Sequence, residues 1–242
     1  MSDSKILDSK IIVALDYADA GSALNLVNQL DPSLCKLKVG KELFTAAGPQ
    51  LVEKLAAKNF AVFLDLKFHD IPTTVKKACQ AASNLGVWML NVHACGGSAM
   101  MQAAAEGVDI GSQGSTKKPL LIAVTVLTSI NQARLNEIGI AETLENQVLK
   151  LAKLTKQAGL QGVVCSAMEA QLLKQHLPGN FLLVTPGIRP ASNSLDDQSR
   201  VLTPTQALSM GASYLVVGRP ITQAANPIEA LININQEISS LL

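Results

Sequence analysis

The residues with the clearest capacity for chemistry lie in one short run, in which carboxylates and a lysine alternate. The run reads FLDLKFHDIPTT from Phe63 to Thr74 and contains Asp65, Lys67 and Asp70. Because strand side chains alternate between two faces, Asp65 and Lys67 are predicted to point to the same side of one strand. A carboxylate beside an ammonium at a strand end can stabilise charge on a reacting group and can transfer a proton.

A second group of residues, late in the chain, has the chemistry of an anion site. Arg189 lies in the segment TPGIRP, and Gly218 and Arg219 lie in VGRPI. Glycine allows a ligand to approach the backbone closely, and a guanidinium offers forked donors to a phosphate. The polar residues 191–200 follow Arg189, and they are predicted to form either a plain connection or a lid over a ligand.

These groups need a scaffold, and the apolar pattern of the chain predicts one. Eight short apolar runs are predicted strands, namely residues 11–15, 35–39, 61–66, 88–93, 120–127, 162–165, 181–185 and 214–217. Segments with helical periodicity lie between them, including residues 48–58, 73–85, 142–159 and 203–210, and Gly86, Gly159 and Gly211 are predicted to follow helix ends. Such alternation is typical of parallel strands joined by helices.

An open doubly wound sheet shares this alternation, so the prediction of a closed sheet rests on the number of units. Eight units within 242 residues favour an α/β fold of the (β/α)8 TIM-barrel type, with residues 1–242 forming a single catalytic domain. Catalytic groups of such barrels come from the C-terminal ends of the strands and from the loops that follow. The chemistry-bearing residues predicted at these positions are Asp16, Lys38, Asp65, Lys67, Asp70, His93, Thr128, Arg189 and Arg219.

A purely structural network of ion pairs is the alternative explanation for these charges. Charged side chains at the ends of apolar strands cost free energy unless they are paired or used. Buried ion pairs add little stability relative to apolar packing, so their clustering at a barrel mouth favours a functional role.

Composition narrows the class of protein further. Apolar residues make up 48% of the chain and aromatic residues only 3%, which favours an aliphatic core around buried parallel strands. With 20 basic and 19 acidic residues, the chain is not expected to bind nucleic acid or an anionic membrane through a broad charged surface.

The expected location is the cytoplasm. Residues 1–10 are polar, and the apolar run 11–15 is too short for a signal core or a membrane span. The four cysteines show no CxxC pair and no zinc-like spacing, so they are expected to be buried, reduced thiols.

Taken together, the motifs resemble those of the orotidine 5'-phosphate decarboxylase family. The run DLKFHDIPTT, LDY at Asp16, KVG at Lys38, TPGIRP and VGRPI occur in the family's order over essentially the whole chain. The pattern DxKxxD alone is shared with related sugar-phosphate enzymes, whereas its combination with the other four motifs is specific. No matched position departs from the family pattern.

This resemblance implies the conversion of orotidine 5'-monophosphate to UMP and carbon dioxide, the last step of de novo pyrimidine synthesis, without metal or organic cofactor. Lys38, Asp65, Lys67 and Asp70 would surround the reacting C6 atom. Lys67 would deliver a proton to C6, Asp65 would lie near the departing carboxylate, and Asp70 would reach the partner's site across a homodimer interface. The other implied substrate contacts are Asp16 and Lys38 to the ribose, Thr74 within the DIPTT element, Thr128 to the pyrimidine, and Gln198, Arg189, Gly218 and Arg219 to the phosphate.

Two alternatives remain open at this point. A related magnesium-dependent sugar-phosphate lyase or decarboxylase would share DxKxxD, but such enzymes usually carry an acidic metal ligand at the end of the second strand, where this chain has Lys38. A non-catalytic barrel that binds phosphorylated metabolites would have no evident need for Lys67 and its neighbouring aspartates.

The three histidines give no further assignment. His69 fits a catalytic or a plain loop residue equally well, and His93 is expected to be a hydrogen-bonded structural group. No metal site is expected, because the histidines lack the i, i+4 spacing of helical zinc sites.

Overall fold

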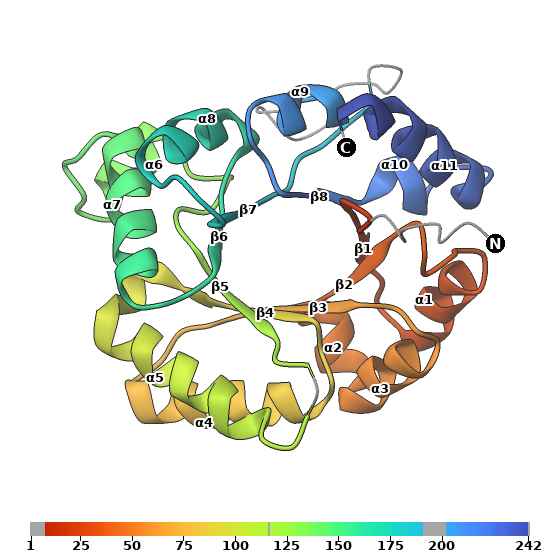
Figure 1. Cartoon of the computed structure of the whole chain (residues 1–242), viewed down its shortest axis with the longest axis horizontal. Coiled ribbons are helices and arrows are strands. Elements are labelled where there is room, and N and C mark those ends of the chain that lie inside the picture. Colours follow the sequence, from red (N-terminus) through yellow and green to blue (C-terminus); the bar gives the residue numbers. More distant parts are fainter. Residues whose placement is uncertain (1–7, 116, 191–201, 242) are drawn as a thin grey trace.

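The computed structural model describes residues 8–115, 117–190 and 202–241. Eight parallel strands form a closed barrel in which each strand pairs with the next and β8 pairs with β1. The strands are β1 (Ile11–Leu15), β2 (Lys36–Gly40), β3 (Val62–Phe68), β4 (Met89–His93), β5 (Leu120–Val124), β6 (Gly162–Val164), β7 (Leu182–Thr185) and β8 (Tyr214–Val217). Figure 1 shows the strands around the centre and the helices as an outer ring. The predicted (β/α)8 barrel is confirmed.

The helices follow the strands in the expected alternation. They are α1 (Ala20–Val27), α2 (Lys41–Ala47), α3 (Pro49–Ala57), α4 (Pro72–Asn84), α5 (Gly97–Gly111), α6 (Gln132–Glu137), α7 (Leu144–Gln157), α8 (Ala167–His176), α9 (Pro204–Ser209), α10 (Arg219–Thr222) and α11 (Pro227–Ile238), with short 3₁₀ turns η1 (Ala94–Gly96) and η2 (Ser239–Leu241). The three glycines predicted to follow helix ends all have positive φ, at 72°, 85° and 102°. Within the described part of the chain, no helix is long and apolar enough to cross a membrane.

One predicted strand is too long. Residues 120–127 were expected to form the fifth strand, but β5 ends at Val124. Its neighbour β6 has only three residues, so the ladder between them ends at the pair Val124 and Val164. The next residue, Thr125, donates its side-chain hydroxyl to the carbonyl of Val164, and the chain then leaves the barrel.

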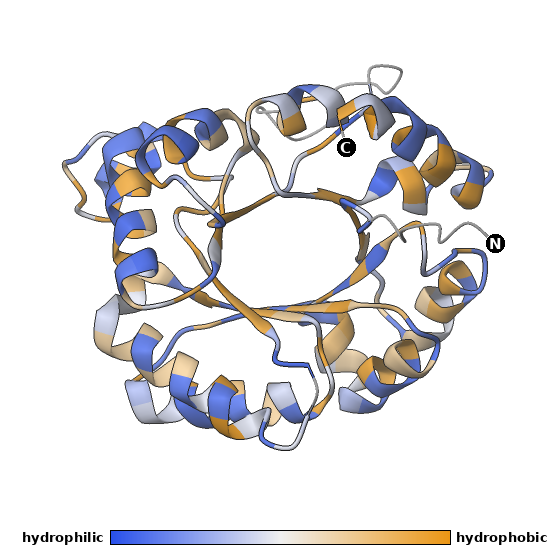
Figure 2. Cartoon of the chain, in the orientation of Figure 1, coloured by the Kyte–Doolittle hydropathy of each residue, from blue (hydrophilic) through white to orange (hydrophobic). Residues whose placement is uncertain are grey.

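Alternation along the strands divides the apolar side chains into two layers. Side chains such as Ile12, Phe63 and Met89 form a cluster inside the barrel. Their neighbours in sequence, such as Val13 and Leu64, belong to the larger cluster between the strands and the helices. Figure 2 accordingly shows hydrophobic colour along the strands and mixed colour on the outer helices. Because both faces of each strand are buried, the sheet is fixed in register.

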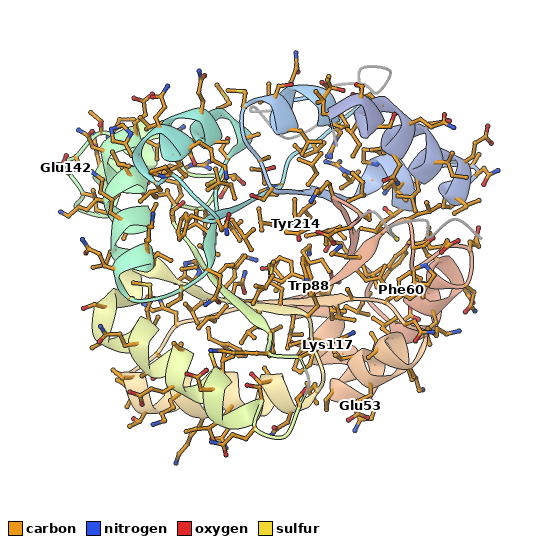
Figure 3. All side chains as sticks on the ribbon, in the orientation of Figure 1. Glu53, Phe60, Trp88, Lys117, Glu142 and Tyr214 are labelled. Atoms are coloured by element: carbon orange, nitrogen blue, oxygen red, sulfur yellow. The ribbon has the colours of Figure 1, made fainter. Side chains whose placement is uncertain are left out.

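The N-terminal end of the barrel is filled by aromatic and charged side chains. The rings of Trp88 and Tyr214, which point into the barrel in Figure 3, meet edge to face with their centroids 5.0 Å apart. Lys36 lies over both rings and places its Nζ 2.5 Å from Oδ1 of Asp8. Burial raises the pKa of Asp8, but hydrogen bonds from Lys36 and Tyr214 outweigh it and hold that pKa below its usual value. The open cavity described below lies at the opposite end.

Two glycines allow α4 and α5 to pack closely, side by side at the edge of the barrel (Figure 1). Gly107 and Gly111 lie one turn apart on the face of α5 that meets α4. A Cβ atom on Gly107 would overlap the carbonyl oxygen of Lys76, and one on Gly111 would overlap that of Gln80. This contact matters for the site, because α4 directly follows the loop that carries Asp70.

Gly107→Ala is therefore expected to destabilise the protein, although alanine normally favours a helix over glycine. Forcing a methyl group against the backbone of α4 should lower the free energy of unfolding by about 1–3 kcal/mol. Urea unfolding measures this change, with Gln102→Ala on the exposed side of α5 as the control, expected within about 0.5 kcal/mol of the unmodified chain. An unchanged or raised stability of Gly107→Ala would contradict the close packing.

Candidate active site

A cavity of about 560 Å³ opens at the C-terminal ends of the strands. It brings together eight of the residues that the sequence nominates: Asp16, Lys38, Asp65, Lys67, Thr128, Arg189, Gly218 and Arg219. A second cavity of about 490 Å³, at the N-terminal end around Lys10, Lys174 and Tyr214, has no carboxylate in its lining. The cavity at the C-terminal end therefore combines carboxylates with lysines and arginines, and it lies where barrels of this type place their active sites.

Four charged side chains on one side of this cavity form a continuous chain of alternating sign. The Nζ atom of Lys38 lies 3.0 Å from Oδ1 of Asp16 and 3.5 Å from Oδ2 of Asp65. The other oxygen of Asp65, Oδ1, lies 2.7 Å from Nζ of Lys67. Lys38 and Asp65 are buried, whereas Asp16 is open to solvent. The array is set in place by folding, so a substrate meets charges that are already oriented.

Strand register explains how β1, β2 and β3 deliver these charges to one place. Lys38 pairs with Ala14 of β1 on one side and with Phe63 of β3 on the other. Asp65 stands opposite Gly40, where a Cβ atom would lie 3.3 Å from Nζ of Lys38. The glycine of the KVG motif therefore leaves room for the lysine ammonium between the two aspartates.

Lys67 reaches Asp65 by a different route from the regular alternation expected from the sequence. The register of β3 on β4 shifts between Leu64 and Phe68, and Lys67 adopts a left-handed backbone with φ of 54°. A non-glycine residue in this region is costly and must be held by its surroundings. The contact between Lys67 and Asp65 thus belongs to an irregular, strained strand end.

The sequence analysis missed Asn91, which supports this irregular strand end. Asn91 is fully buried on β4 and accepts a hydrogen bond from the backbone N–H of Lys67 at 2.8 Å. Its amide also donates to Oδ1 of Asp65 at 2.7 Å. The sequence does carry one signal for it: Asn91 is a polar residue inside an apolar strand, two positions before His93 and therefore on the same face. Strand ends alone do not reveal such a residue.

Further lining residues of the cavity come from the ends of β5, β7 and β8. Thr128 follows β5, Arg189 follows β7, and Gly218 and Arg219 follow β8 at the start of α10. Arg189 is fixed by backbone pairing of its neighbour Ile188 with Leu202 and by a bond from Nη1 to the carbonyl of Ile188. The two arginines therefore lie at the ends of β7 and β8, the strands where barrels commonly bind phosphate, and β8 is the direct neighbour of β1, which Asp16 follows.

Apolar side chains form the remaining wall between these two groups. They are Ala14, Phe63, Val124, Val126, Leu127, Val164 and Val216. A wall of this kind keeps water away from the array and strengthens the interactions of its charges.

Four of the nominated residues are not among the described residues that line the cavity: Asp70, Thr74, Gln198 and His93, which is described below. Asp70 and Thr74 are exposed beyond the end of β3, next to Ile71, a large apolar side chain that is 64% exposed. Pro72 begins α4, as the sequence predicts. Thr74 therefore lies in the first turn of that helix, and Asp70 lies just before it. Gln198 and the polar segment 191–200 lie outside the described residues.

His93 lies at the end of β4, beside the array. Its ring centroid is 5.6 Å from that of His69. Burial, followed by the nearby His69, Lys41 and Lys67, lowers the pKa of His93 to about 4. His93 is therefore neutral at physiological pH. Among the described residues, no group of three or more His, Cys, Asp or Glu side chains is arranged to hold a metal.

A closed (β/α)8 barrel with a preformed charge array at its C-terminal mouth defines an enzyme, and comparisons with known proteins identify the family. A model of the orotidine 5'-phosphate decarboxylase / HUMPS family matches residues 9–234. The orotidine 5'-phosphate decarboxylase of Nitrosococcus oceani is 60% identical over 233 residues, which cover 96% of this chain and 99% of the relative. That of Chromobacterium violaceum is 59% identical over 234 residues, covering 97% and 93%.

A solved structure agrees with the sequence relatives. The crystal structure of orotidine 5'-phosphate decarboxylase from Lactobacillus acidophilus aligns with a TM-score of 0.86 at 40% identity and covers 95% of this chain and 99% of that one. The chain belongs to the orotidine 5'-phosphate decarboxylase / HUMPS family, and the resemblance inferred from its motifs is confirmed. It is a carboxy-lyase.

The depressed pKa of His93 predicts a loss of stability in acid. An unfolded histidine has a pKa near 6.5, whereas that of His93 in the folded chain is about 4. Between these values the unfolded state binds a proton that the folded state does not, so the free energy of unfolding falls as the pH drops from 6.5 towards 4. Below pH 4 the contribution of His93 to this free energy is lost in full.

His93→Gln should therefore lose less stability than the unmodified chain between about pH 7.5 and about pH 5. Urea unfolding at the two pH values measures the difference. His176→Gln, at an exposed position on α8, is the matched control and should keep the pH dependence of the unmodified chain. Equal losses in His93→Gln and the unmodified chain would contradict the lowered pKa of His93 in the folded state.

Proposed function

We propose that the chain converts orotidine 5'-monophosphate to UMP and carbon dioxide, with Lys67 as the proton donor. The observation that carries this proposal is the alternating chain Asp16–Lys38–Asp65–Lys67, which lines one side of the cavity. The pair of arginines that also lines this cavity supports a substrate that carries a phosphate.

Decarboxylation at C6 of the pyrimidine has a specific electrostatic demand. The bond between C6 and the carboxylate carbon breaks, carbon dioxide leaves, and the electron pair stays on C6 in the plane of the ring. The ring π system cannot delocalise this pair, so nearby positive charge must stabilise it. The ammonium of Lys67 supplies that charge and then gives its proton to C6, which forms the C6–H bond of UMP.

The aspartates have two tasks in this proposal. Their carboxylates hold the ammonium groups of Lys38 and Lys67 in place through the short contacts described above. Asp65 also stands where it would face the substrate carboxylate, so departure of neutral carbon dioxide removes a like-charge contact. Its short contact with Lys67, at 2.7 Å between Oδ1 and Nζ, supports this placement.

The remaining lining residues serve substrate binding. Arg189 and Arg219 bind the phosphate together with the backbone at Gly218, and Gln198 completes this group. Asp16 and Lys38 hold the ribose hydroxyls, and Thr128 contacts the pyrimidine. The volume of about 560 Å³ suits a single nucleotide. Binding energy from the phosphate can then support the chemistry at C6.

The position of Lys38 favours this reaction over the magnesium-dependent alternative. Its ammonium lies between the carboxylates of Asp16 and Asp65, at 3.0 Å and 3.5 Å from one oxygen of each. A divalent cation bound by the same carboxylates would be repelled by this lysine. The proposal therefore includes no metal and no organic cofactor.

Release of UMP and carbon dioxide from orotidine 5'-monophosphate in excess EDTA is the direct test. We expect sustained turnover by the unmodified chain. Lys67→Ala should lose turnover by a factor of about 10⁴ or more, because it removes both the charge and the proton at C6, while it keeps its affinity for UMP through the arginines. Arg219→Ala is the matched comparison and should weaken UMP binding instead.

No turnover by folded, unmodified protein in EDTA, with turnover restored by magnesium on a sugar phosphate, would contradict the proposal. Turnover by Lys67→Ala near that of the unmodified chain would contradict the role of Lys67 alone.

We further propose that the active unit is a homodimer in which Asp70 completes the partner's site. Asp70 and Thr74 carry the family motif, yet both are exposed and do not line the cavity of their own chain. Ile71, between them, exposes 64% of its surface, which suits burial against a partner. We also propose that the enzyme works in the cytoplasm, which its four free cysteines support. Three of them are buried as expected, whereas the expectation was wrong for Cys95, which is exposed after the end of β4.

Mixing two inactive variants tests the shared site. A dimer of one Lys67→Ala chain and one Asp70→Ala chain would hold one intact site, because Lys67 of the second chain meets Asp70 of the first. An equal mixture that has exchanged subunits should regain about a quarter of full activity. Lys67→Ala mixed with Asp65→Ala is the control and should regain none, since both residues belong to the same chain's site. Equal failure of the two mixtures would place Asp70 in its own chain's site.

A further inference from the structure

We propose that Asn91 is a positioning residue that holds the Asp65–Lys67 pair in its reactive geometry. This inference rests on the proposed function, because it concerns the same proton donor. Asn91 does not line the cavity, so it acts through its two neighbours and not on the substrate.

The need for such a residue arises from the irregular end of β3. Leu64 pairs with Leu90 and Phe68 pairs with Val92, so three residues of β3, Asp65 to Lys67, stand opposite Asn91 alone. The ladder therefore cannot satisfy every backbone group of this stretch. The side chain of Asn91 accepts the bond from the backbone N–H of Lys67, at 2.8 Å.

The same side chain fixes the carboxylate of Asp65. Its Nδ2 donates to Oδ1 at 2.7 Å, and Nζ of Lys67 donates to that same oxygen at 2.7 Å. With Oδ1 held from two directions, Oδ2 is turned towards Lys38, 3.5 Å away. Asn91 thus ties the backbone of the proton donor to the carboxylate that orients its side chain.

Only an amide of this length can make both contacts. An aspartate at position 91 would accept from Lys67 but could not donate to Asp65, and its charge would repel that carboxylate. A leucine has a similar volume but makes neither bond. Lys67, at φ of 54°, would then lose the partner that helps to hold its left-handed backbone.

The test compares Asn91→Asp and Asn91→Leu with the unmodified chain by steady-state kinetics in EDTA, by UMP affinity and by thermal unfolding. We expect kcat to fall about 100-fold in both variants, because a displacement of the proton donor on the order of 1 Å has an effect of this size. KM and UMP affinity should stay within about threefold, since the phosphate and ribose contacts are intact.

The pH profile separates a positioning role from a merely structural one. In Asn91→Asp, protonation of the new carboxyl group lets it donate to Asp65 as the amide does, so part of the lost kcat should return as the pH falls. Asn25→Asp, the same chemical change at an exposed position on α1, should leave both kcat and the profile unchanged. Hydrogen exchange at the amide of Lys67 should become faster in Asn91→Leu, which reports the clamp without any turnover.

Three outcomes would overturn the inference. One is a kcat within about twofold of the unmodified chain in both variants. Another is equal loss of kcat and UMP affinity, which would mark a general loss of structure, and Asn91→Asp decides the question where Asn91→Leu fails to fold. Unchanged exchange at Lys67 in a folded Asn91→Leu is the third. If the unmodified chain shows no turnover, the proposed function is refuted, and the kinetic role of Asn91 is refuted with it.

Discussion

Two lysine ammonium groups and one asparagine amide meet at the carboxylate of Asp65, and the geometry of the site follows from how its two oxygens are shared. Oδ1 accepts from Lys67 and Asn91, and Oδ2 faces Lys38. A buried carboxylate is costly without partners, and here each oxygen of Asp65 faces at least one of the three. The array therefore holds as a unit, in which each charge limits where the next can lie. This mutual constraint keeps a flexible lysine side chain at one place before any substrate arrives.

The barrel supplies the frame that makes this unit possible. Consecutive parallel strands bring Lys38, Asp65 and Asn91 from β2, β3 and β4 close together near the C-terminal end of the barrel, because their registers are fixed by apolar side chains on both faces. At the N-terminal end, Lys36, Asp8, Trp88 and Tyr214 close the barrel with a second charged network. The two networks differ in what surrounds them. The N-terminal network is packed against aromatic rings, and of its four members only Tyr214 lines the second cavity. All four charges of the C-terminal array line the cavity of about 560 Å³, where a ligand can meet them.

Much of this could be predicted from the sequence, and what could not has a physical reason. All eight strands can be predicted because each is a short apolar run between helical segments. The charged residues that end several of these runs indicate where the cavity lies. The end of β5 was misplaced because the pairing partner β6, and not the apolar run itself, limits the strand. Asn91 was missed because a single polar residue inside a strand carries no sign of its partners. The left-handed backbone of Lys67 was equally hidden, since strand periodicity assumes a regular pleat.

The separation between the array and the arginines explains why the cost of building the array is tolerable. Strained backbone at Lys67 and buried charge at Lys38 and Asp65 reduce stability, and the aliphatic core between strands and helices offsets that reduction. Arg189 and Arg219 follow β7 and β8, outside the contacts that join Lys38, Asp65 and Lys67, so a phosphate bound there leaves those three charges free to act at the reacting atom. Substrate binding and charge stabilisation can therefore be strong at the same time. A site that used one set of charges for both would weaken its pull on the developing carbanion whenever it tightened its hold on the substrate.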